Sequence, residues 1–307
     1  MTLGEVASHC YNITTSYLSV SNDSAVIEST KDAIQITRNH FLQEIFPRWN
    51  PFSDQISFSY NGGKDCQALL ILYLSCLWEF FLSSIQVSQY PPEYHLFPLK
   101  FLPTVYINQA ETFRTLEESI ETTRSRYFLS VYESPRNQTS MPEAFKNYLE
   151  HNTQTEAIVI GIRYTDPFGA DLKCIQKTDS DWPEFMRIQP LLHWSLSNVW
   201  SLLLYSNEEI CGLYEKGFTS VGSVNSTVPN PYLKRNPVAE REGNGPENHF
   251  KWEIRNAFGK EEPTDEVHVS RFSDSDAKIL QEAGQLDYYP GWFLVDDSLE
   301  RAGRARR

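Results

Sequence analysis

The chain has 307 residues, of which 40% are hydrophobic, and its 27 basic and 40 acidic side chains give a net charge of -13. This length and apolar content are enough for one large core without metal or disulfide support, and the acidic excess disfavours broad binding to polyanions such as nucleic acid or anionic membrane. Five cysteines, an odd number without a CxxC pair, predict neither a disulfide framework nor a zinc site.

The sequence also bears on location and assembly. The N-terminal region lacks a basic stretch joined to an apolar one, and the apolar runs stop short of the roughly 20 residues needed to span a bilayer. We therefore expect no targeting or membrane-spanning segment. A cytoplasmic monomer fits these features best, with small molecules as partners and neither nucleic acid nor membrane.

The first part of the chain predicts helices followed by a strand. Apolar residues recur at helical spacing between residues 2 and 49, with a break near 21–24, which indicates two helices. Residues 55–59 predict a short strand. A glycine pair follows, and the leucine-rich segment 66–81 then predicts a buried helix.

Strands and helices alternate in the next part. Segments 101–107 and 157–162 are nearly continuous apolar runs, which is typical of strands in a sheet covered on both faces. Helical patterns at 113–127 and 142–151 alternate with them. This order predicts an α/β fold with a doubly wound, mostly parallel sheet.

The remainder is less regular. A further strand is predicted at 187–194, then a helix from Ser195 to residue 205 and a helical turn at 208–214, near which the sheet should end. Segment 225–264 is rich in proline, asparagine, glycine and charge, so we expect a surface excursion. The arginine-rich tail after Leu299 is expected to be exposed and to add little stability.

The segment from Ser59 to Asp65 predicts a phosphate-binding loop. It lies between a strand and a helix, where backbone amides and the helix dipole favour an anion, and its glycines allow close approach. We expect Lys64 to add a mobile positive charge, and Asp65 to orient Mg²⁺ or to cap the helix. The candidate ATP ligands in this loop are Ser59, Tyr60, Asn61, Gly62, Gly63, Lys64 and Asp65.

This loop resembles the SGGxDS-type PP-loop of ATP pyrophosphatases, whereas it lacks the Walker A and Rossmann spacings. The resemblance implies that the loop binds the β,γ-pyrophosphate of ATP while a nucleophile attacks the α-phosphorus. It also implies the adenine nucleotide α-hydrolase-like fold. In this topology Ile107, at a strand end, is a candidate for contact with adenine.

Three other segments extend the resemblance to a narrower family. Residues 161–168, which read GIRYTDPF, residues 176–194, and the run ERAGR at 300–304 look similar to the yeast-type FAD synthetases. The resemblance covers most of the chain from about residue 55. It implies an FMN adenylyltransferase that joins FMN to the AMP part of ATP and releases pyrophosphate, with Mg²⁺ as cofactor.

Both substrates are anionic, and their chemistry suggests which side chains bind them. Fixed positive charge must offset repulsion between FMN and ATP, for which Arg163, Arg301 and Arg304 are candidates. The flavin ring needs an aromatic face and polar groups at its edge, and the resemblance assigns Trp182 and Asp179 to that segment. The candidate FMN ligands are Asp166, Asp179, Asp181, Trp182, Arg187, Arg301 and Arg304.

Some of these roles have plainer readings. Arg187 either contacts FMN or pairs with a neighbouring carboxylate, and Trp182 either faces the flavin or belongs to the core. We expect Asn61, Asp65, Asp179 and Arg301 to be catalytic. Asn61, Asp65 and Asp166 are the candidate metal ligands, with Mg²⁺ held mainly by phosphates.

Alternative functions remain open at this point. A phosphoadenosine-phosphosulfate reductase-like enzyme shares the loop and a PLLHW pattern, but it needs a C-terminal cysteine and none follows Cys211. A tRNA-modifying enzyme would need a basic surface, which the net charge disfavours. A non-catalytic nucleotide-binding regulator would show a broken loop or missing arginines.

We divide the chain into three predicted domains. Residues 1–50 form a helical segment packed on the core, and residues 51–220 form the nucleotide- and flavin-binding α/β core. Residues 221–307 form a C-terminal extension that closes over the flavin site.

Overall fold

The computed structural model describes residues 1–86, 95–108, 111–136, 140–237 and 245–304. The chain forms two compact units by its internal contacts. The first comprises residues 1–61, 65–108 and 123–194, and the second comprises 62–64, 109–122 and 195–307. The predicted domains remain a prediction. The units divide near residue 195 rather than 220, because helix α6 (Leu196–Ser206) packs with the later helix α8 (Lys251–Arg255).

The first unit begins with the two predicted helices. Helix α1 spans Leu3–Ser19 and helix α2 spans Ala25–Asn39, with a π-helical turn at His40–Ile45, so the break near 21–24 is confirmed. A capping box opens α1, in which the Thr2 side chain accepts from the Glu5 amide and the Glu5 carboxylate accepts from the Thr2 amide. Local signals alone set this boundary.

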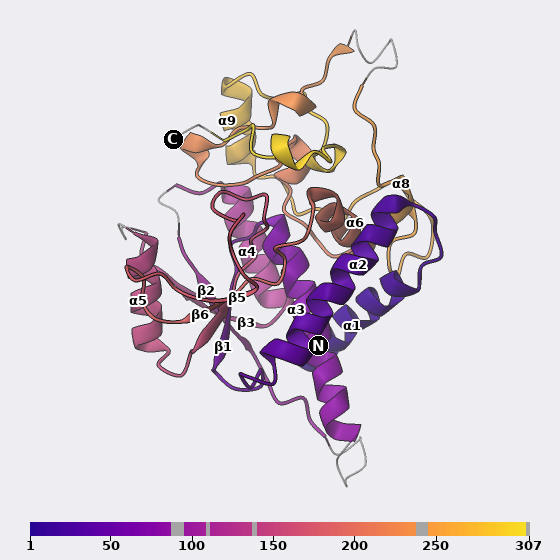
Figure 1. Ribbon diagram of the computed structural model, residues 1–307. Helices are drawn as coiled ribbons and strands as arrows, with labels where there is room; N and C mark the ends of the chain where they lie inside the picture. Colours follow the sequence, from indigo (N-terminus) through magenta and orange to yellow (C-terminus); the bar gives the residue numbers. More distant parts are fainter. Residues whose placement is uncertain (87–94, 109–110, 137–139, 238–244, 305–307) are drawn as a thin grey trace. The chain divides into compact units, whose positions relative to one another are not determined.

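The first unit also contains the sheet, whose six strands have the order β3-β2-β1-β4-β6-β5. All neighbouring strands are parallel except β5, which runs antiparallel to β6. The predicted doubly wound, mostly parallel sheet is therefore confirmed, and Figure 1 shows it in ribbon form. The strands are β1 (Ile56–Ser59), β2 (Leu102–Tyr106), β3 (Leu129–Glu133), β4 (Ala157–Val159), β5 (Ile175–Lys177) and β6 (Met186–Ile188).

Some predicted strands differ from the structure. The strand predicted at 157–162 ends at Val159, and the one predicted at 187–194 lies at Met186–Ile188. Residues 190–194 turn instead toward α2, where the Thr37 hydroxyl donates to the Pro190 carbonyl at 3.1 Å and accepts from the Trp194 indole at 2.9 Å. The long apolar run therefore combines a three-residue strand with a buried loop.

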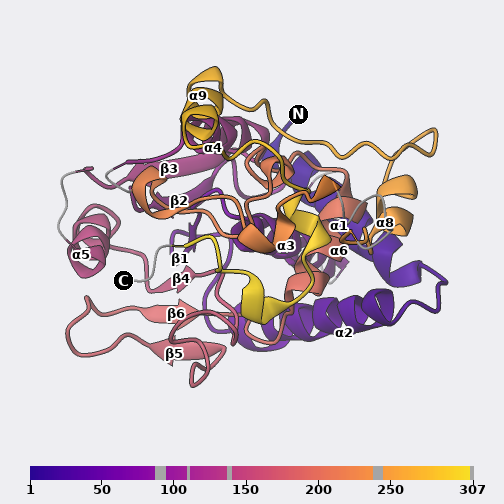
Figure 2. The ribbon, with the colours of Figure 1, turned by 90° about the horizontal axis from the view of Figure 1, so that it is seen from above.

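Helices cover both faces of the sheet. Helix α5 (Met141–His151) lies on one face, and α1, α2 and α3 (Lys64–Gln86) lie on the other, as the view in Figure 2 shows. Helix α5 matches the predicted span, whereas α3 extends the predicted 66–81 at both ends. The parallel strands thus end in loops whose positions are fixed by buried helices on either side.

Helix α3 contains a longer apolar stretch than we expected from the sequence. It is long and apolar enough to cross a membrane by length and composition alone, with a mean hydropathy of 1.9 over its most apolar window. Within the protein, 61% of that window is buried. The core helices of globular folds pass the same test, so the expectation that the chain has no membrane-spanning segment remains a prediction.

The second unit contains most of α4 (Arg114–Arg126) and the chain from α6 onward. Ser195 opens α6 through a capping box with Asn198, as predicted. The helical turn predicted at 208–214 is wrong, because Ile210 forms a bridge with Val269 and the helical turn lies later. The later elements are α6 (Leu196–Ser206), α8 (Lys251–Arg255), α9 (Asp274–Glu282) and 3-10 turns at Tyr214–Lys216, Val224–Ser226, Pro231–Leu233, Gly291–Phe293 and Asp297–Leu299.

The predicted surface excursion at 225–264 is also wrong in part. Leu233, Phe250 and Ile254 are buried, and so is the polar side chain of Asn230. Residues 238–244 of this segment lie outside the described residues. The segment therefore contributes a small core of its own, which its polar composition concealed.

Candidate functional site

The phosphate loop joins β1 to α3, and its tyrosine belongs to the core of the first unit. Tyr60 is 3% exposed. Its hydroxyl donates to the Gln67 side chain at 2.7 Å and its amide donates to the Val105 carbonyl at 3.1 Å. Tyr60 thus fixes the end of β1, so a contact with ATP would come from its backbone rather than from its ring.

The first loop glycine sits where a side chain does not fit. Gly62 has φ +73°, and a Cβ atom there would lie 2.6 Å from Leu116 Cδ1 and 2.8 Å from Ile120 Cγ1 on α4. Both the left-handed backbone and the close approach require glycine. The predicted need for glycine is therefore met by packing against α4.

The loop lysine is not a mobile charge. Lys64 is 2% exposed, and its ammonium forms an ion pair with the buried carboxylate of Glu300. Its backbone amide donates to the Tyr214 hydroxyl at 2.7 Å. The prediction that Lys64 adds a mobile charge is thus corrected, because its ammonium is buried and matched by a carboxylate of the second unit.

Three predicted residues of the first unit converge at the carboxyl end of β4. Arg163 is fully buried, and its Nε lies 2.7 Å from Oδ1 of Asp65 at the start of α3. The amide of Arg163 donates to Asp166 Oδ2 at 2.9 Å. One carboxylate therefore pairs with the buried guanidinium and a second accepts from the backbone of the same residue, at the edge where α/β sheets bind ligands.

Tight packing brings the loop after β4 onto the start of α3. A Cβ on Gly161 would lie 3.1 Å from the Sγ of Cys66 and 3.2 Å from its amide nitrogen. Burial, with a further contribution from Asp65, raises the pKa of the Cys66 thiol to about 12. Burial likewise raises the pKa values of Cys174 and Cys211 to about 12, so these thiols stay neutral near pH 7.

The candidate flavin residues lie on the β5–β6 hairpin. Arg187 Nη2 donates to Asp179 Oδ2 at 3.2 Å and to the Lys177 carbonyl at 3.2 Å. The plainer reading of Arg187, that it pairs with a neighbouring carboxylate, is thus what the structure shows. Asp181 is exposed at the turn, and the amide of Trp182 donates to the Asp179 carbonyl at 3.0 Å.

Trp182 and the predicted adenine contact Ile107 share one apolar platform. Both are partly buried and pack against a cluster formed by Val105, Phe145, Tyr148, Ile158 and Phe185. The Trp182 ring centroid lies 5.8 Å from that of Phe145. The end of β2 and the hairpin turn therefore contribute partly exposed apolar groups to the same surface of the first unit.

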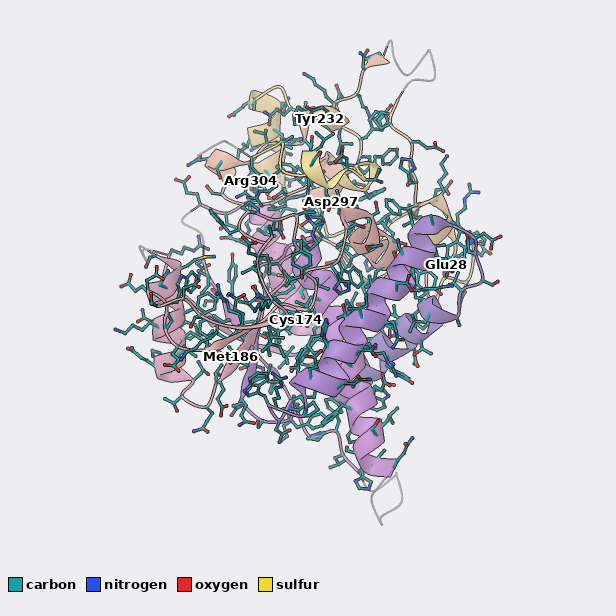
Figure 3. All side chains as sticks on the ribbon, in the orientation of Figure 1. Glu28, Cys174, Met186, Tyr232, Asp297 and Arg304 are labelled. Carbon is teal, nitrogen blue, oxygen red and sulfur yellow. The ribbon has the colours of Figure 1, made fainter. Side chains whose placement is uncertain are left out.

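The C-terminal arginines do not lie on a loose tail. The Val228 amide donates to the Gly303 carbonyl at 2.9 Å, and Arg304 forms an antiparallel bridge with Thr227. The guanidinium of Arg304 occupies the space beside Gly222, where a Cβ would lie 2.2 Å from Nη2. Arg301 is exposed, whereas Glu300 and Gly303 are buried and Arg304 is half-buried, so the predicted exposed tail is corrected for these last three residues. Figure 3 labels Arg304.

Sequence reasoning missed several residues that hold the loop in place. Tyr214 and Glu300 both contact Lys64. Tyr214 gave no signal in the sequence, and Glu300 belonged to the ERAGR resemblance but was given no role. Asp276 on α9 was also missed. Its carboxylate accepts from the amides of Arg114 at 3.2 Å and Thr115 at 2.7 Å, and so caps helix α4.

The donors around the loop fit a magnesium ion held mainly by substrate. No group of three or more His, Cys, Asp or Glu residues that could hold a metal occurs among the described residues. Asp65 and Asp166 approach the same arginine, and Asn61 is exposed in the loop. Mg²⁺ commonly takes one or two carboxylates and completes its shell with phosphate and water, which matches this sparse set.

Comparison with known proteins identifies related sequences. The model of the phosphoadenosine phosphosulfate reductase domain matches residues 55–229, more than half of the chain. The chain is 53% identical to the flavin adenine dinucleotide synthase of Saccharomyces cerevisiae, covering all of both proteins. It is 31% identical to a probable FAD synthase of Schizosaccharomyces pombe, covering 81% of this chain and 84% of that protein.

A solved structure matches over the whole fold. The Candida glabrata FMN adenylyltransferase in complex with FAD and inorganic pyrophosphate has a TM-score of 0.92 and 50% identity, covering 99% of this chain and all of that chain. The predicted family resemblance is confirmed by these matches, which extend beyond the loop to both termini.

Proposed function

Because this chain belongs to the FAD synthase family, we propose that it is an FMN adenylyltransferase, which transfers AMP from ATP to the phosphate of FMN. The products are FAD and pyrophosphate. The observation that carries the proposal is the 53% identity over the full length of both chains. The site geometry supports it, because a glycine-containing loop at the start of a buried helix precedes a carboxylate–arginine pair at the sheet edge.

The reaction needs positioning more than proton transfer. The phosphate of FMN is already a nucleophile near neutral pH, and its oxygen attacks the α-phosphorus as the bond to the pyrophosphate oxygen breaks. The loop amides at the start of α3, together with Ser59 and Asn61, would hold the leaving pyrophosphate. No general base is required for this step.

Positively charged groups must offset the negative charges of FMN and ATP. Arg301 and Arg304 would offset the charge of the FMN phosphate, and Arg163 would act near the α-phosphate with its orientation fixed by Asp65. A bound Mg²⁺ would supply further neutralisation of the phosphates, with Asn61 and Asp65 as its nearest protein ligands. The metal itself remains part of the proposal.

The flavin would lie against the apolar platform of the first unit. Trp182 offers a partly exposed aromatic side chain, and the Asp179–Arg187 pair places polar groups on the same hairpin. Ile107 would contact adenine from the same apolar cluster. Asp166 and the exposed Asp181 remain candidates for polar contacts with FMN.

The alternative chemistries have less support. The buried thiols of Cys66 and Cys211 are neutral, which disfavours the thiol chemistry of a reductase. A non-catalytic regulator would bind FMN and ATP without forming FAD. We also propose that the protein is a monomer in the cytoplasm and that it binds neither nucleic acid nor membrane.

The test is direct. The purified protein is incubated with FMN, ATP and Mg²⁺, and FAD and pyrophosphate are quantified over time. We expect equal amounts of both products, and roughly 100-fold slower turnover for Asn61→Ala and Asp65→Ala, as for the loss of other preorganised groups. Asn12→Ala, at an exposed position on α1, is the matched control and should retain the wild-type rate. Failure of the wild-type protein to form FAD would refute the proposal.

A further inference from the structure

A buried ion pair links the phosphate loop to the C-terminal segment. Lys64 and Glu300 are 2% and 5% exposed, and their charged groups are in contact although 236 residues separate them in the chain. Both belong to the second unit. Charged side chains are rarely buried to this degree unless they are paired, so each group requires the other.

An aromatic ring lies beside the buried ammonium. The Trp200 ring centroid lies 6.0 Å from Lys64 Nζ, and the Tyr214 ring packs edge-on against Trp200 with centroids 5.2 Å apart. The Tyr214 hydroxyl also accepts a hydrogen bond from the backbone amide of Lys64. Low polarity strengthens the attraction to Glu300 and makes its loss costly.

The backbone beside Glu300 is held from the other side. The Thr219 hydroxyl donates to the Glu300 carbonyl at 2.6 Å, and the buried side-chain amide of Asn230 donates to the Leu299 carbonyl at 2.9 Å. With the bond from Val228 to Gly303, these contacts fix the turn that carries the two arginines. The Lys64–Glu300 contact ties this turn to the phosphate loop.

We infer that Lys64 is a positioning residue, whose ammonium holds the arginine segment 299–304 on the phosphate loop instead of binding polyphosphate. The inference rests on the proposed function for its catalytic consequence. An ammonium that turned toward phosphate would break its buried ion pair with Glu300, which is costly at this degree of burial. The loop therefore contributes amides to pyrophosphate, and its lysine orients Arg301 and Arg304.

Three variants test this role. Lys64→Met and Glu300→Gln each remove one charge, and the double variant Lys64→Met with Glu300→Leu removes both and leaves no buried charge unpaired. We expect turnover to fall roughly 10- to 100-fold in each, because small misplacements of charged groups are that costly. The double variant should be no worse than the worse single variant, since both act through one contact.

Two further measurements separate positioning from direct binding. Calorimetric titration with inorganic pyrophosphate should give affinities within about threefold of wild type for Lys64→Met, an effect well under 1.4 kcal/mol. Trypsin should cleave after Arg301 faster in Lys64→Met than in wild type, as the loosened segment opens. Arg271→Met is the matched control, because it breaks an ion pair with Asp274 whose partners are 78% and 84% exposed.

One pattern would overturn the inference. If Lys64→Met weakens pyrophosphate binding more than about tenfold while Glu300→Gln keeps full turnover, Lys64 is a direct phosphate ligand. Unchanged trypsin cleavage in Lys64→Met would also refute the tether. If wild-type protein forms no FAD but cleavage after Arg301 still accelerates, the proposed function fails and the tether stands.

Discussion

Replacing Gly62 with alanine tests whether the phosphate loop depends on its packing against α4. The left-handed backbone at φ +73° costs an L-residue about 1–2 kcal/mol. The new Cβ would also lie 2.6 Å from Leu116 Cδ1, and forcing an extra methyl into a packed core costs about 1–3 kcal/mol more. We therefore expect Gly62→Ala to lose about 2–5 kcal/mol of unfolding free energy.

Gly259 is a matched control in the same unit. It has the same φ of +73°, but a Cβ there meets nothing within 4 Å, so Gly259→Ala should lose only the backbone contribution. Urea denaturation of both variants measures the difference, and FAD formation should fall only for Gly62→Ala. Adding Leu116→Ala to Gly62→Ala should restore part of the activity. Equal losses of stability in the two glycine variants, with full activity in both, would refute the packing argument.

Three other changes have expected outcomes. A chain ending at Leu299 leaves Lys64 buried without its carboxylate, so it should lose about 3–5 kcal/mol in urea denaturation, and adding Lys64→Met should recover part of that loss. Trp182→Ala should raise the KM for FMN while leaving that for ATP nearly unchanged, whereas the half-buried Trp252 replaced by alanine should alter neither. Burial raises the pKa of Glu253, so the folded state holds that proton more tightly and stability should fall as pH rises above the ordinary glutamate range. Glu253→Gln should show a smaller loss of melting temperature between pH 5 and pH 8, and an equal loss would contradict this.

Local signals in the sequence predicted much of the fold correctly. Ser195 opens α6 as predicted, and the apolar runs around Phe58 and Val105 form strands of the sheet. These features depend on neighbours within a few residues, or on burial on both faces of a strand. The helix start is signalled by neighbouring residues, and the continuous apolar runs indicate the strands that the fold buries.

The missed strands are short and polar, so periodicity could not reveal them. Strand β3 (Leu129–Glu133) has only its first residue buried, and β5 (Ile175–Lys177) has three residues, none of which is fully buried. Their pairing with β2 and β6 is what makes them strands. Tertiary context overrode weak local preference here, as is common for edge strands.

In the candidate site, too, local features were predictable from the sequence and long-range contacts were not. The loop glycines were predicted for close approach of an anion, whereas the packing of Gly62 against α4 is a tertiary contact that the sequence did not reveal. The partners of Lys64 and Asp65 were not predictable, because Glu300 and Arg163 lie far away in sequence and opposite charges give no information on which pairs meet. A lysine in a phosphate loop suggests a mobile positive charge, and its buried pair with Glu300 could not be predicted from the sequence.

The pairing of charges changes where positive potential for the reaction must come from. Lys64 is matched by Glu300, Arg163 by Asp65, and Arg187 by Asp179, so each of these cations brings an anion with it. Paired guanidinium groups still orient and donate hydrogen bonds, but they offset little of the charge that FMN and ATP bring together. That task then falls to the loop amides, to a metal held by the phosphates, and to Arg301 and Arg304. A segment that supplies this charge must be fixed, because catalysis by electrostatics requires groups that are oriented before the reaction begins. The buried Lys64–Glu300 contact meets that requirement, which is why a lysine that binds no phosphate would still be needed for phosphate chemistry.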